Sequence, residues 1–291
     1  MNIIKIQSLN LEFGRKGILK IDRVEFKSPR IYGIIGPNGS GKSTLLKVLC
    51  GIIENYSGNV SINGKNIKES RIECSSIMGS LIENPFFYPY SSPLEFMKYM
   101  IEMKTGRKEK SEENAMSLLA MIHIADKRNQ MIRTLSTGEL KRLGISSALA
   151  GNPGIILLDE PTENLDVIGK ELIVKILRET MLTGNRIILV TSHDSGFMEQ
   201  ICDEVIFLKD GVPVYSMELD HKEKIKVHFL DINEARKIPD KFNVIERGSD
   251  YIIIEGDPNP FINYVASNNI KIRNFNKKSD LNDKYREIFD D

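Results

Sequence analysis

The feature that most constrains how this chain can fold is a glycine-rich segment between two apolar runs. Residues 36–44 read GPNGSGKST, directly after IYGII and directly before LLKVL. Glycine adopts positive φ angles without strain, so three glycines in nine positions predict a tightly folded loop. A strand, such a loop and a helix in this order indicate an α/β unit in which backbone N–H groups converge on one point.

The residue types in this loop fit a ligand rich in phosphate. Converging N–H groups and the positive end of the following helix both stabilise negative charge. In the pattern GxxxxGKS/T the lysine reaches the β- and γ-phosphates and the next hydroxyl binds Mg²⁺. A chance glycine-rich turn is the alternative, and the strand and helix around the loop argue against it. The residues expected to hold the triphosphate are Gly36, Pro37, Asn38, Gly39, Ser40, Gly41, Lys42, Ser43 and Thr44.

A second apolar run ends in two carboxylates. The segment GIILLDE at residues 154–160 predicts a short buried strand, and an unpaired buried charge there would be costly. We expect Asp159 to orient Mg²⁺ through a water, and Glu160 to act as the general base for a water that attacks the γ-phosphate. The alternative is an acidic pair solvated at the surface, which the upstream loop makes less attractive.

Changes of pattern divide the first 215 residues into three parts. Residues 1–82 alternate like strands, residues 85–150 carry apolar residues at helical spacing, and residues 151–215 return to strands that alternate with helices. Strands alternating with helices favour a parallel sheet. We therefore expect one α/β domain over residues 1–215, with a helical subdomain at about residues 85–150.

The remaining residues, 220–291, change character again. Strand-like and helix-like segments follow in the order βαββαβ, and Asp257-Pro258 is a typical helix start. This order predicts a small α+β C-terminal domain with a ferredoxin-like fold.

Composition limits the classes of partner. The 291 residues contain 40 Lys+Arg and 40 Asp+Glu, so the chain lacks the basic excess typical of nucleic-acid-binding proteins, and no nucleic acid is expected. Cys50, Cys74 and Cys202 are scattered and indicate reduced thiols in a reducing compartment. No apolar run approaches the ~20 residues that span a bilayer, so we expect any membrane role to come through a partner.

The motifs of residues 1–215 resemble, in their order, those of the ATP-binding subunits of ABC transporters. GPNGSGKS is similar to Walker A, LSTGE (135–139) to the signature usually written LSGGQ, and IILLDE to Walker B, while PTENLD (161–166) and TSHD (191–194) are similar to the D-loop and H-loop. The resemblance implies a P-loop NTPase core with a parallel or mixed sheet, an antiparallel β subdomain and a helical subdomain. It also implies ATP and Mg²⁺ as ligands.

The same resemblance implies roles for further residues. His193 is similar to the switch histidine that contacts the γ-phosphate, and Asp166 to the D-loop residue that crosses a dimer interface. Ser136 and the amide of Gly138 are similar to the signature groups that contact phosphate. Phe13 stands where the family places an aromatic ring that stacks on adenine, and a core Phe near a strand end is the alternative.

Two positions depart from the family pattern. Glu83 replaces the glutamine of the Q-loop, and its carboxylate remains able to bind Mg²⁺ or to orient water. In the signature, Thr137 and Glu139 replace Gly and Gln. We expect both residues to weaken the closing of two subunits around ATP. Glu139 would do so because it places a negative charge close to a triphosphate.

The resemblance implies that the protein acts as a pair. Each ATP is held between the P-loop of one subunit and the signature of the other, so the chain needs a second ABC ATPase subunit, identical or not. It also implies an integral-membrane permease, contacted through the helical region and the segment 83–90 on the cytoplasmic face of the membrane. An aromatic group in this segment is expected to receive the permease, or alternatively to be a buried cluster: Phe86, Phe87, Tyr88 and Tyr90.

Three functions are consistent with these motifs. The leading interpretation is the ATPase of an exporter, because IMGSLIENPFFYP resembles drug- and antibiotic-resistance ATPases. The second is an importer subunit with a regulatory C-terminal domain. The third, a non-transport ABC ATPase acting on ribosomes or DNA, is disfavoured because the chain has one set of motifs and no long coiled coil.

Overall fold

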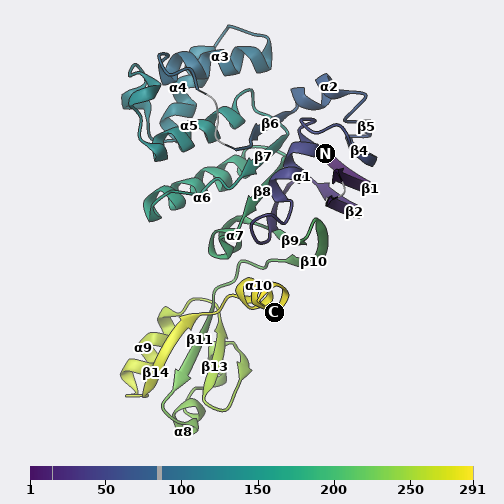
Figure 1. Ribbon diagram of the computed structural model, residues 1–291. Helices are drawn as coiled ribbons and strands as arrows, with labels where there is room; N and C mark the ends of the chain where they lie inside the picture. The colour runs from purple at the N-terminus through teal and green to yellow at the C-terminus, as the bar shows by residue number, and fades with distance from the viewer. Residues whose placement is uncertain (15, 84–86, 291) are drawn as a thin grey trace. The chain divides into compact units, whose positions relative to one another are not determined.

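The structure is a computed structural model, and it describes residues 1–14, 16–83 and 87–290. The chain forms two compact units, Met1–Leu219 and Asp220–Asp291 (Figure 1). Among the residues that the structure describes, none of the helices has the length and apolar character that a bilayer span requires.

A six-stranded sheet lies at the centre of the first unit. Its strand order is β10-β9-β3-β8-β7-β6, and all neighbouring pairs are parallel except β9 with β10. The central strands β7 and β8 are buried along their whole length, and β3 is buried after Arg30, as expected of a parallel sheet covered on both faces. The strands are β3 (Arg30–Ile35), β6 (Met78–Leu81), β7 (Ile155–Asp159), β8 (Ile187–Ser192), β9 (Glu204–Lys209) and β10 (Val212–Glu218).

The register of this sheet brings three predicted motifs to one edge. Ile35 pairs with Ser192, and Asp159 pairs with Thr191, so β3, β7 and β8 end at the same level. The glycine-rich loop, the two carboxylates and the H-loop histidine directly follow these strand ends. Parallel strands thus place side chains from distant parts of the chain at the carboxyl edge of the sheet.

A smaller antiparallel sheet has the strand order β2-β1-β4-β5. Its apolar residues share one core with the large sheet and with α1 (Lys42–Leu49), for example Leu11, Leu19 and Leu46. The strands are β1 (Ile3–Phe13), β2 (Lys16–Lys27), β4 (Ser57–Ile62) and β5 (Lys65–Asn66), and α2 (Arg71–Ser76) follows them.

Three helices between β6 and β7 form the helical subdomain. The helices are α3 (Pro93–Thr105), α4 (Ser111–Met121) and α5 (Thr137–Leu149), and the short 3₁₀ turns η1 (Ala125–Lys127) and η2 (Ile132–Thr134) lie between α4 and α5. Ser92 and Ser136 form capping boxes at the starts of α3 and α5, whereas α4 has no side-chain cap. Two further helices, α6 (Val167–Leu182) and α7 (Ser195–Ile201), flank β8 in sequence.

The predicted α/β class with an antiparallel and a helical subdomain is confirmed, and several elements go beyond the prediction. Sequence reading did not identify α2, β6, α7, β9 or β10. The strand β10 extends to Glu218, past residue 215 at which we expected the first domain to end. Pro213 within this edge strand obscures the strand pattern, because proline cannot donate to a strand ladder.

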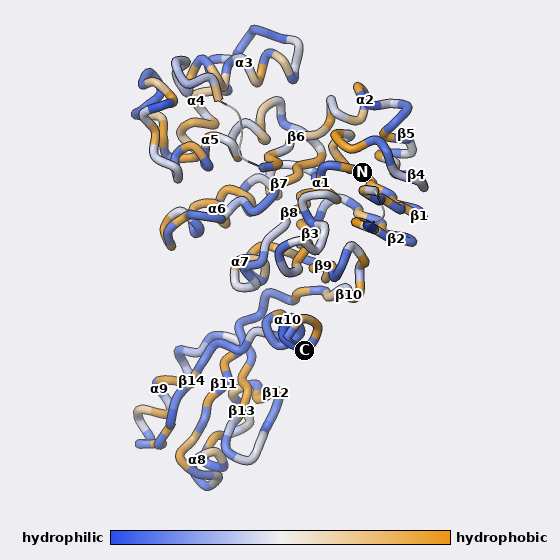
Figure 2. Tube along the Cα trace, in the orientation of Figure 1, coloured by the Kyte–Doolittle hydropathy of each residue, from blue (hydrophilic) through white to orange (hydrophobic). Residues whose placement is uncertain are grey.

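The second unit has the element order βαββαβ followed by a helix. Its sheet order is β12-β13-β11-β14, entirely antiparallel, so the first and third strands lie in the centre as in a ferredoxin-like fold. Figure 2 shows apolar residues along β11 and β13, which contribute Val227 and Ile252 to a separate core with Phe261 of α9. The elements are β11 (Lys224–Phe229), α8 (Ile232–Arg236), η3 (Asp240–Phe242), β12 (Val244–Arg247), β13 (Tyr251–Glu255), α9 (Asn259–Ser267), β14 (Ile272–Lys277) and α10 (Asp280–Phe289).

Candidate nucleotide-binding and hydrolysis site

The glycine-rich loop joins β3 to α1, and its glycines are required by its geometry. Gly39 and Gly41 have φ angles of 83° and 101°. A Cβ atom on Gly36 would lie 2.3 Å from the carbonyl oxygen of Leu208 in β9. Side chains at these positions would therefore strain the loop or displace the neighbouring strand.

The start of α1 is left open to an anion. Its N-cap is Gly41, which has no side chain to accept from the first turn, and that turn has no acidic residue. By contrast, Ser92 and Asp166 cap α3 and α6 with their own oxygens. The first N–H groups of a helix have no partner within the helix, so those of α1 can bind phosphate. The buried hydroxyl of Ser40, which makes no hydrogen bond among the described residues, is a further donor for such a ligand.

Lys42 places a cation inside the loop. Its buried Nζ donates to the carbonyl oxygens of Gly36 and Pro37, at 2.8 and 3.1 Å, and lies 4.0 Å from Oε1 of Glu160. Burial lowers the pKa of Lys42, and the carboxylates of Glu160 and Asp159 oppose that change. The loop itself thus holds the ammonium at the open start of α1.

Both acidic residues at the end of β7 are held by Thr191 of β8, Asp159 through its carboxylate and Glu160 through its backbone N–H. Asp159 is buried and its Oδ1 accepts from the hydroxyl of Thr191 at 2.5 Å. The amide N–H of Glu160 donates to both the carbonyl and the hydroxyl oxygen of Thr191, each at 3.1 Å. Glu160 has a φ angle of 43°, a left-handed conformation that costs a residue with a side chain about 1 kcal/mol or more.

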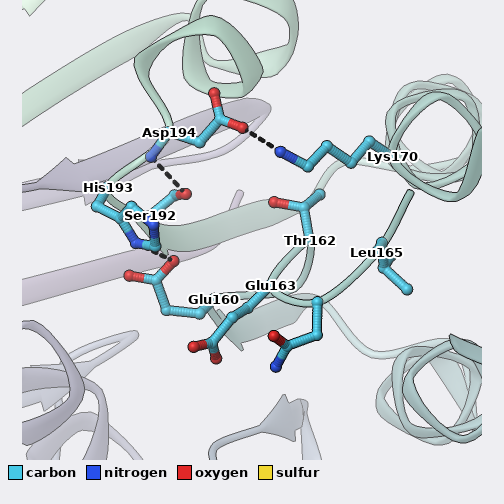
Figure 3. A pocket seen from close by; sticks show the side chains of 9 residues that line it. Glu160, Thr162, Glu163, Leu165, Lys170, Ser192, His193 and Asp194 are labelled. Carbon is cyan, nitrogen blue, oxygen red and sulfur yellow. Dashed lines mark hydrogen bonds and ion pairs between the residues drawn. The ribbon is translucent and has the colours of Figure 1, made fainter. Parts of the chain in front are cut away.

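The carboxylate of Glu160 lies between a cation and an imidazole. Its Oε2 is 3.2 Å from Nδ1 of His193, and its Oε1 is 4.0 Å from Nζ of Lys42. Figure 3 draws the contact with His193. The imidazole is half exposed, so one ring edge contacts Glu160 while the side chain remains accessible to a ligand. This arrangement suits a carboxylate that accepts a proton from water and a histidine that orients the reacting groups.

A cavity of about 290 Å³ lies beside this pair. On its wall, Asp194 accepts from Nζ of Lys170 at 2.6 Å. Figure 3 draws this contact. Asp194 also caps α7 by accepting from Phe197 N–H at 3.1 Å. Burial raises the pKa of Asp194, but these hydrogen bonds outweigh burial and the pKa lies below its ordinary value. The lining residues are Glu160, Thr162, Glu163, Asn164, Leu165, Lys170, Ser192, His193 and Asp194.

The oxygen atoms available at this site fit magnesium better than a metal whose ligands all come from protein side chains. Within the described part of the chain, no group of three or more His, Cys, Asp or Glu residues could hold a metal by itself. Ser43 and Asp159 offer oxygen donors, and Mg²⁺ is usually bound by one or two protein oxygens together with phosphates and waters.

Ser136 begins α5 within a capping box. Its Oγ accepts from Glu139 N–H at 3.3 Å, which leaves the hydroxyl hydrogen free to donate. The carboxylate of Glu139 accepts from Ser136 N–H at 2.9 Å and from Nζ of Lys127 at 2.5 Å. Ser136 and Gly138 share no hydrogen bond or ion pair with the glycine-rich loop among the residues described, so within one chain the signature is separate from the P-loop.

Glu83 shares no hydrogen bond or ion pair with Ser43 or Asp159 among the described residues. Its exposed carboxylate forms an ion pair with Lys47 of α1, and its φ angle is 61°. The residues that follow it, 84–86, lie outside the described part of the chain.

Two other predicted residues have clear local surroundings. Phe13, at the end of β1, is 56% exposed, which argues against the alternative of a core residue. Asp166 is the N-cap of α6 and accepts from Gly169 N–H at 2.7 Å, so its carboxylate has a structural contact whatever else it does. Within the loop, Pro37, Asn38 and Gly39 are exposed, and Ser43 and Thr44 are half-buried.

Sequence reasoning missed three residues that hold this site. Thr191 and Asp194 belong to the TSHD segment, from which only the histidine was given a role, so the motif itself carried the signal. Lys127 stands in no motif, and its contact with Glu139 could be found only from the structure.

Comparison with known proteins decides the family. The family model described as ABC transporter matches residues 19–163. The chain is 31% identical over 216 residues to the arginine transport ATP-binding protein ArtM of Bacillus subtilis, covering 73% of this chain and 90% of ArtM. The chain belongs to the ATP-binding proteins of ABC transporters. As an ABC ATPase, it binds and hydrolyses ATP as part of a transporter that includes a membrane permease.

Other relatives of this ABC ATPase include one that is named for a different transported substrate. The chain is 31% identical over 227 residues to the lantibiotic transport ATP-binding protein SrtF of Streptococcus pyogenes, covering 78% of this chain and 96% of SrtF. Among solved structures, the dimeric ABC transporter cassette MJ0796 is similar with a TM-score of 0.68 and 27% identity, covering 74% of this chain and 98% of MJ0796. A second structure of MJ0796 is a post-hydrolysis dimer with ADP and Pi, at a TM-score of 0.66 and 26% identity. These structures support a dimeric ATPase.

Proposed function

We propose that this ABC ATPase hydrolyses Mg²⁺-ATP at the carboxyl edge of its large sheet, while paired with a second ABC ATPase subunit. The observation that carries the proposal is the position of Glu160, with Lys42 at 4.0 Å on one side and His193 at 3.2 Å on the other. The uncapped start of α1 adjoins Lys42. A base, a phosphate-binding cation and an anion-binding helix end thus occur together.

Each group has a defined task in this proposal. The N–H groups of residues 36–44 and the ammonium of Lys42 bind the β- and γ-phosphates, and exposed Phe13 stacks on adenine. Glu160 accepts the proton of the attacking water, and His193 holds the γ-phosphate and that water in place. Ser43 and Asp159, with Glu83 as a further candidate, would hold Mg²⁺, which neutralises phosphate charge when bound.

The second subunit supplies the other half of each site. Its Ser136 hydroxyl and Gly138 amide contact the γ-phosphate, and its Asp166 crosses the interface. Hydrolysis removes this shared ligand, so the pair closes on ATP and opens after hydrolysis. Support comes from the separation of the signature and the P-loop within one chain, and from the dimeric form of MJ0796.

The helical subdomain is the proposed permease contact, on the cytoplasmic face of the membrane. Tyr90 is 74% exposed, with the guanidinium of Arg133 5.1 Å from its ring centre. Phe87 packs edge-on against Phe96 of α3, with ring centres 5.2 Å apart. Exposure of Tyr90 favours docking over the buried-cluster alternative, and Phe86 lies outside the described residues.

We propose export as the direction of transport, on the likeness of residues 77–89 to resistance ATPases. The relatives include both an arginine transport protein and a lantibiotic transport protein at equal identity. Purifying the native complex from membranes identifies the permease, and the side of a vesicle on which its substrate accumulates decides the direction. Accumulation on the ATPase side would contradict export and favour the importer alternative, with residues 220–291 as its regulatory domain.

Glu160→Gln is the direct test of the site. The amide keeps the shape and the ATP contacts but cannot accept a proton, so turnover should fall by at least about 100-fold while ATP binding persists. The variant should therefore form an ATP-dependent dimer on size-exclusion chromatography. Parent-level hydrolysis by this variant would show that Glu160 is not the base, and absence of any ATP-dependent association would contradict the paired mechanism.

A further inference from the structure

The signature of this chain carries an acidic residue whose two carboxylate oxygens are both engaged. Oε1 of Glu139 accepts from Nζ of Lys127 at 2.5 Å, and Oε2 accepts from the amide N–H of Ser136 at 2.9 Å. The same residue returns a hydrogen bond from its own N–H to Oγ of Ser136 at 3.3 Å. Lysine, glutamate and serine thus form one connected group at the start of α5.

This group is partly removed from solvent. The Glu139 side chain is 13% exposed and that of Lys127 34%. Burial raises the pKa of Glu139, but the hydrogen bonds from Lys127 and Ser136 outweigh burial and leave the pKa below its ordinary value. Glu139 is therefore ionised near neutral pH, and at this burial its charge is less screened than that of a surface carboxylate.

An ionised carboxylate at this place has a consequence for anion binding. The start of a helix attracts phosphate through its free N–H groups and its dipole, and a neighbouring uncompensated negative charge opposes that attraction. The ammonium of Lys127 supplies the compensating charge. Its backbone is fixed by η1, since Lys127 N–H donates to Ile124 O at 3.0 Å and its carbonyl accepts from Gln130 N–H at 2.9 Å.

We propose that Lys127 is a positioning residue of the closing half-site: it neutralises Glu139 and holds that carboxylate on Ser136, so that the start of α5 can bind the γ-phosphate of ATP on the second subunit. The inference rests on the proposed function, in which the signature contacts the ATP of the partner subunit. It reverses the expectation that Glu139 weakens closure, because the negative charge has its own counter-ion.

The test measures the ATP concentration that gives half-maximal dimer in the Glu160→Gln background. Lys127→Met exposes the charge of Glu139 at both sites of a dimer and should raise this concentration by about fivefold or more. In a chain that also carries Glu139→Gln, the Lys127→Met effect should fall below about twofold, because no carboxylate remains to neutralise. Lys127→Arg should restore the parent value.

Lys98→Met is the matched control. Lys98 pairs with Glu112 at 2.8 Å in the same helical subdomain, and its side chain is 35% exposed, close to the 34% of Lys127. Lys98→Met removes a positive charge from the same subdomain but leaves the signature contacts in place. It should therefore change the half-maximal ATP concentration by less than about twofold. Circular dichroism checks that each variant is folded. If Lys127→Met is not folded, Lys127→Gln replaces it.

Two results would overturn the inference. One is that Lys127→Met raises the half-maximal ATP concentration equally in the chain with Glu139 and in the chain with Glu139→Gln. The other is that Lys127→Met raises it no more than Lys98→Met does. Either result can occur while the parent Glu160→Gln protein dimerises normally with ATP, and the proposed function then stands. Failure of that parent to dimerise overturns the proposed function and this inference with it.

Discussion

At the scale of single residues, the site is maintained by charges that are paired in specific ways. Asp194 follows the H-loop histidine, and its carboxylate joins Lys170 of α6 to the start of α7. Its side chain also lies on the wall of the cavity beside Glu160. The hydrogen bonds that hold Asp194 therefore bear on the local stability of the segment that carries His193.

The pairing of Asp194 predicts a pH dependence of stability. Its pKa in the fold lies below the ordinary value of 3.8, so its contribution is fully present above that value and is lost as pH falls through the folded pKa. Asn keeps the helix cap but not the charge, so Asp194→Asn should lower the free energy of unfolding by about 1 kcal/mol at about pH 7. The difference should shrink towards about pH 3. Urea denaturation at several pH values measures it, and a difference that is constant with pH would contradict the assignment.

At the scale of elements, short capping and glycine signals were readable from the sequence. Gly41 and Ser92 act within a few residues of their own positions, so the starts of α1 and α3 could be predicted. The strand β6 could not, because it has only four residues and is defined by pairing with the distant strand β7. The catalytic motifs are also short local patterns, so they could be predicted. The contact between Lys127 and Glu139 depends on how the chain folds, so it could not.

Arg186 connects three elements and has no carboxylate partner among the described residues. Its buried guanidinium donates to Thr180 O at 2.5 Å near the end of α6, and to Pro153 O at 3.1 Å just before β7. It also donates to the side chains of Thr183 and Asn152. The side chain thus gives Pro153 O its donor among the described residues and adds a second donor to Thr180 O, which also accepts from the Thr183 hydroxyl at 3.0 Å. It also fixes the segment leading into the strand that carries Asp159.

Arg186→Met should therefore destabilise the first unit strongly. It leaves Pro153 O without a donor among the described residues and removes one of the two donors of Thr180 O, which costs about 2 kcal/mol in total. Thermal unfolding should show a fall of several degrees in the Tm of that unit, whereas Arg178→Met, which removes an exposed guanidinium bonded to Gln200 O, should change the Tm little. Equal Tm values for the parent and Arg186→Met would show that water replaces these hydrogen bonds without cost.

At the scale of the whole molecule, each unit has its own apolar core. Residues of the second unit, such as Phe229 and Ile254, pack with Phe261 in a cluster separate from that of the ATPase unit. A domain of about 70 residues with a closed core can fold alone. We infer that residues 220–291 are an accessory domain whose folding does not depend on the first unit.

Ending the chain after Leu219 should leave a folded protein that binds ATP, because the described contacts of Lys42, Glu160 and His193 all lie before that residue. Calorimetry of the full chain should show two unfolding transitions, with only the ATP-sensitive one kept in the shortened protein. A shortened protein that is unfolded or does not bind ATP would contradict this independence.

The two hydrogen bonds from Lys42 to carbonyl oxygens of its own loop have a consequence for the entropy of ligand binding. A free lysine side chain loses about 1.5–2 kcal/mol of rotamer entropy when it is immobilised. Here the ammonium is held beforehand at 2.8 and 3.1 Å from Gly36 O and Pro37 O. An arriving phosphate therefore exchanges acceptors with a donor that is already ordered, and most of the entropic penalty has been met by folding.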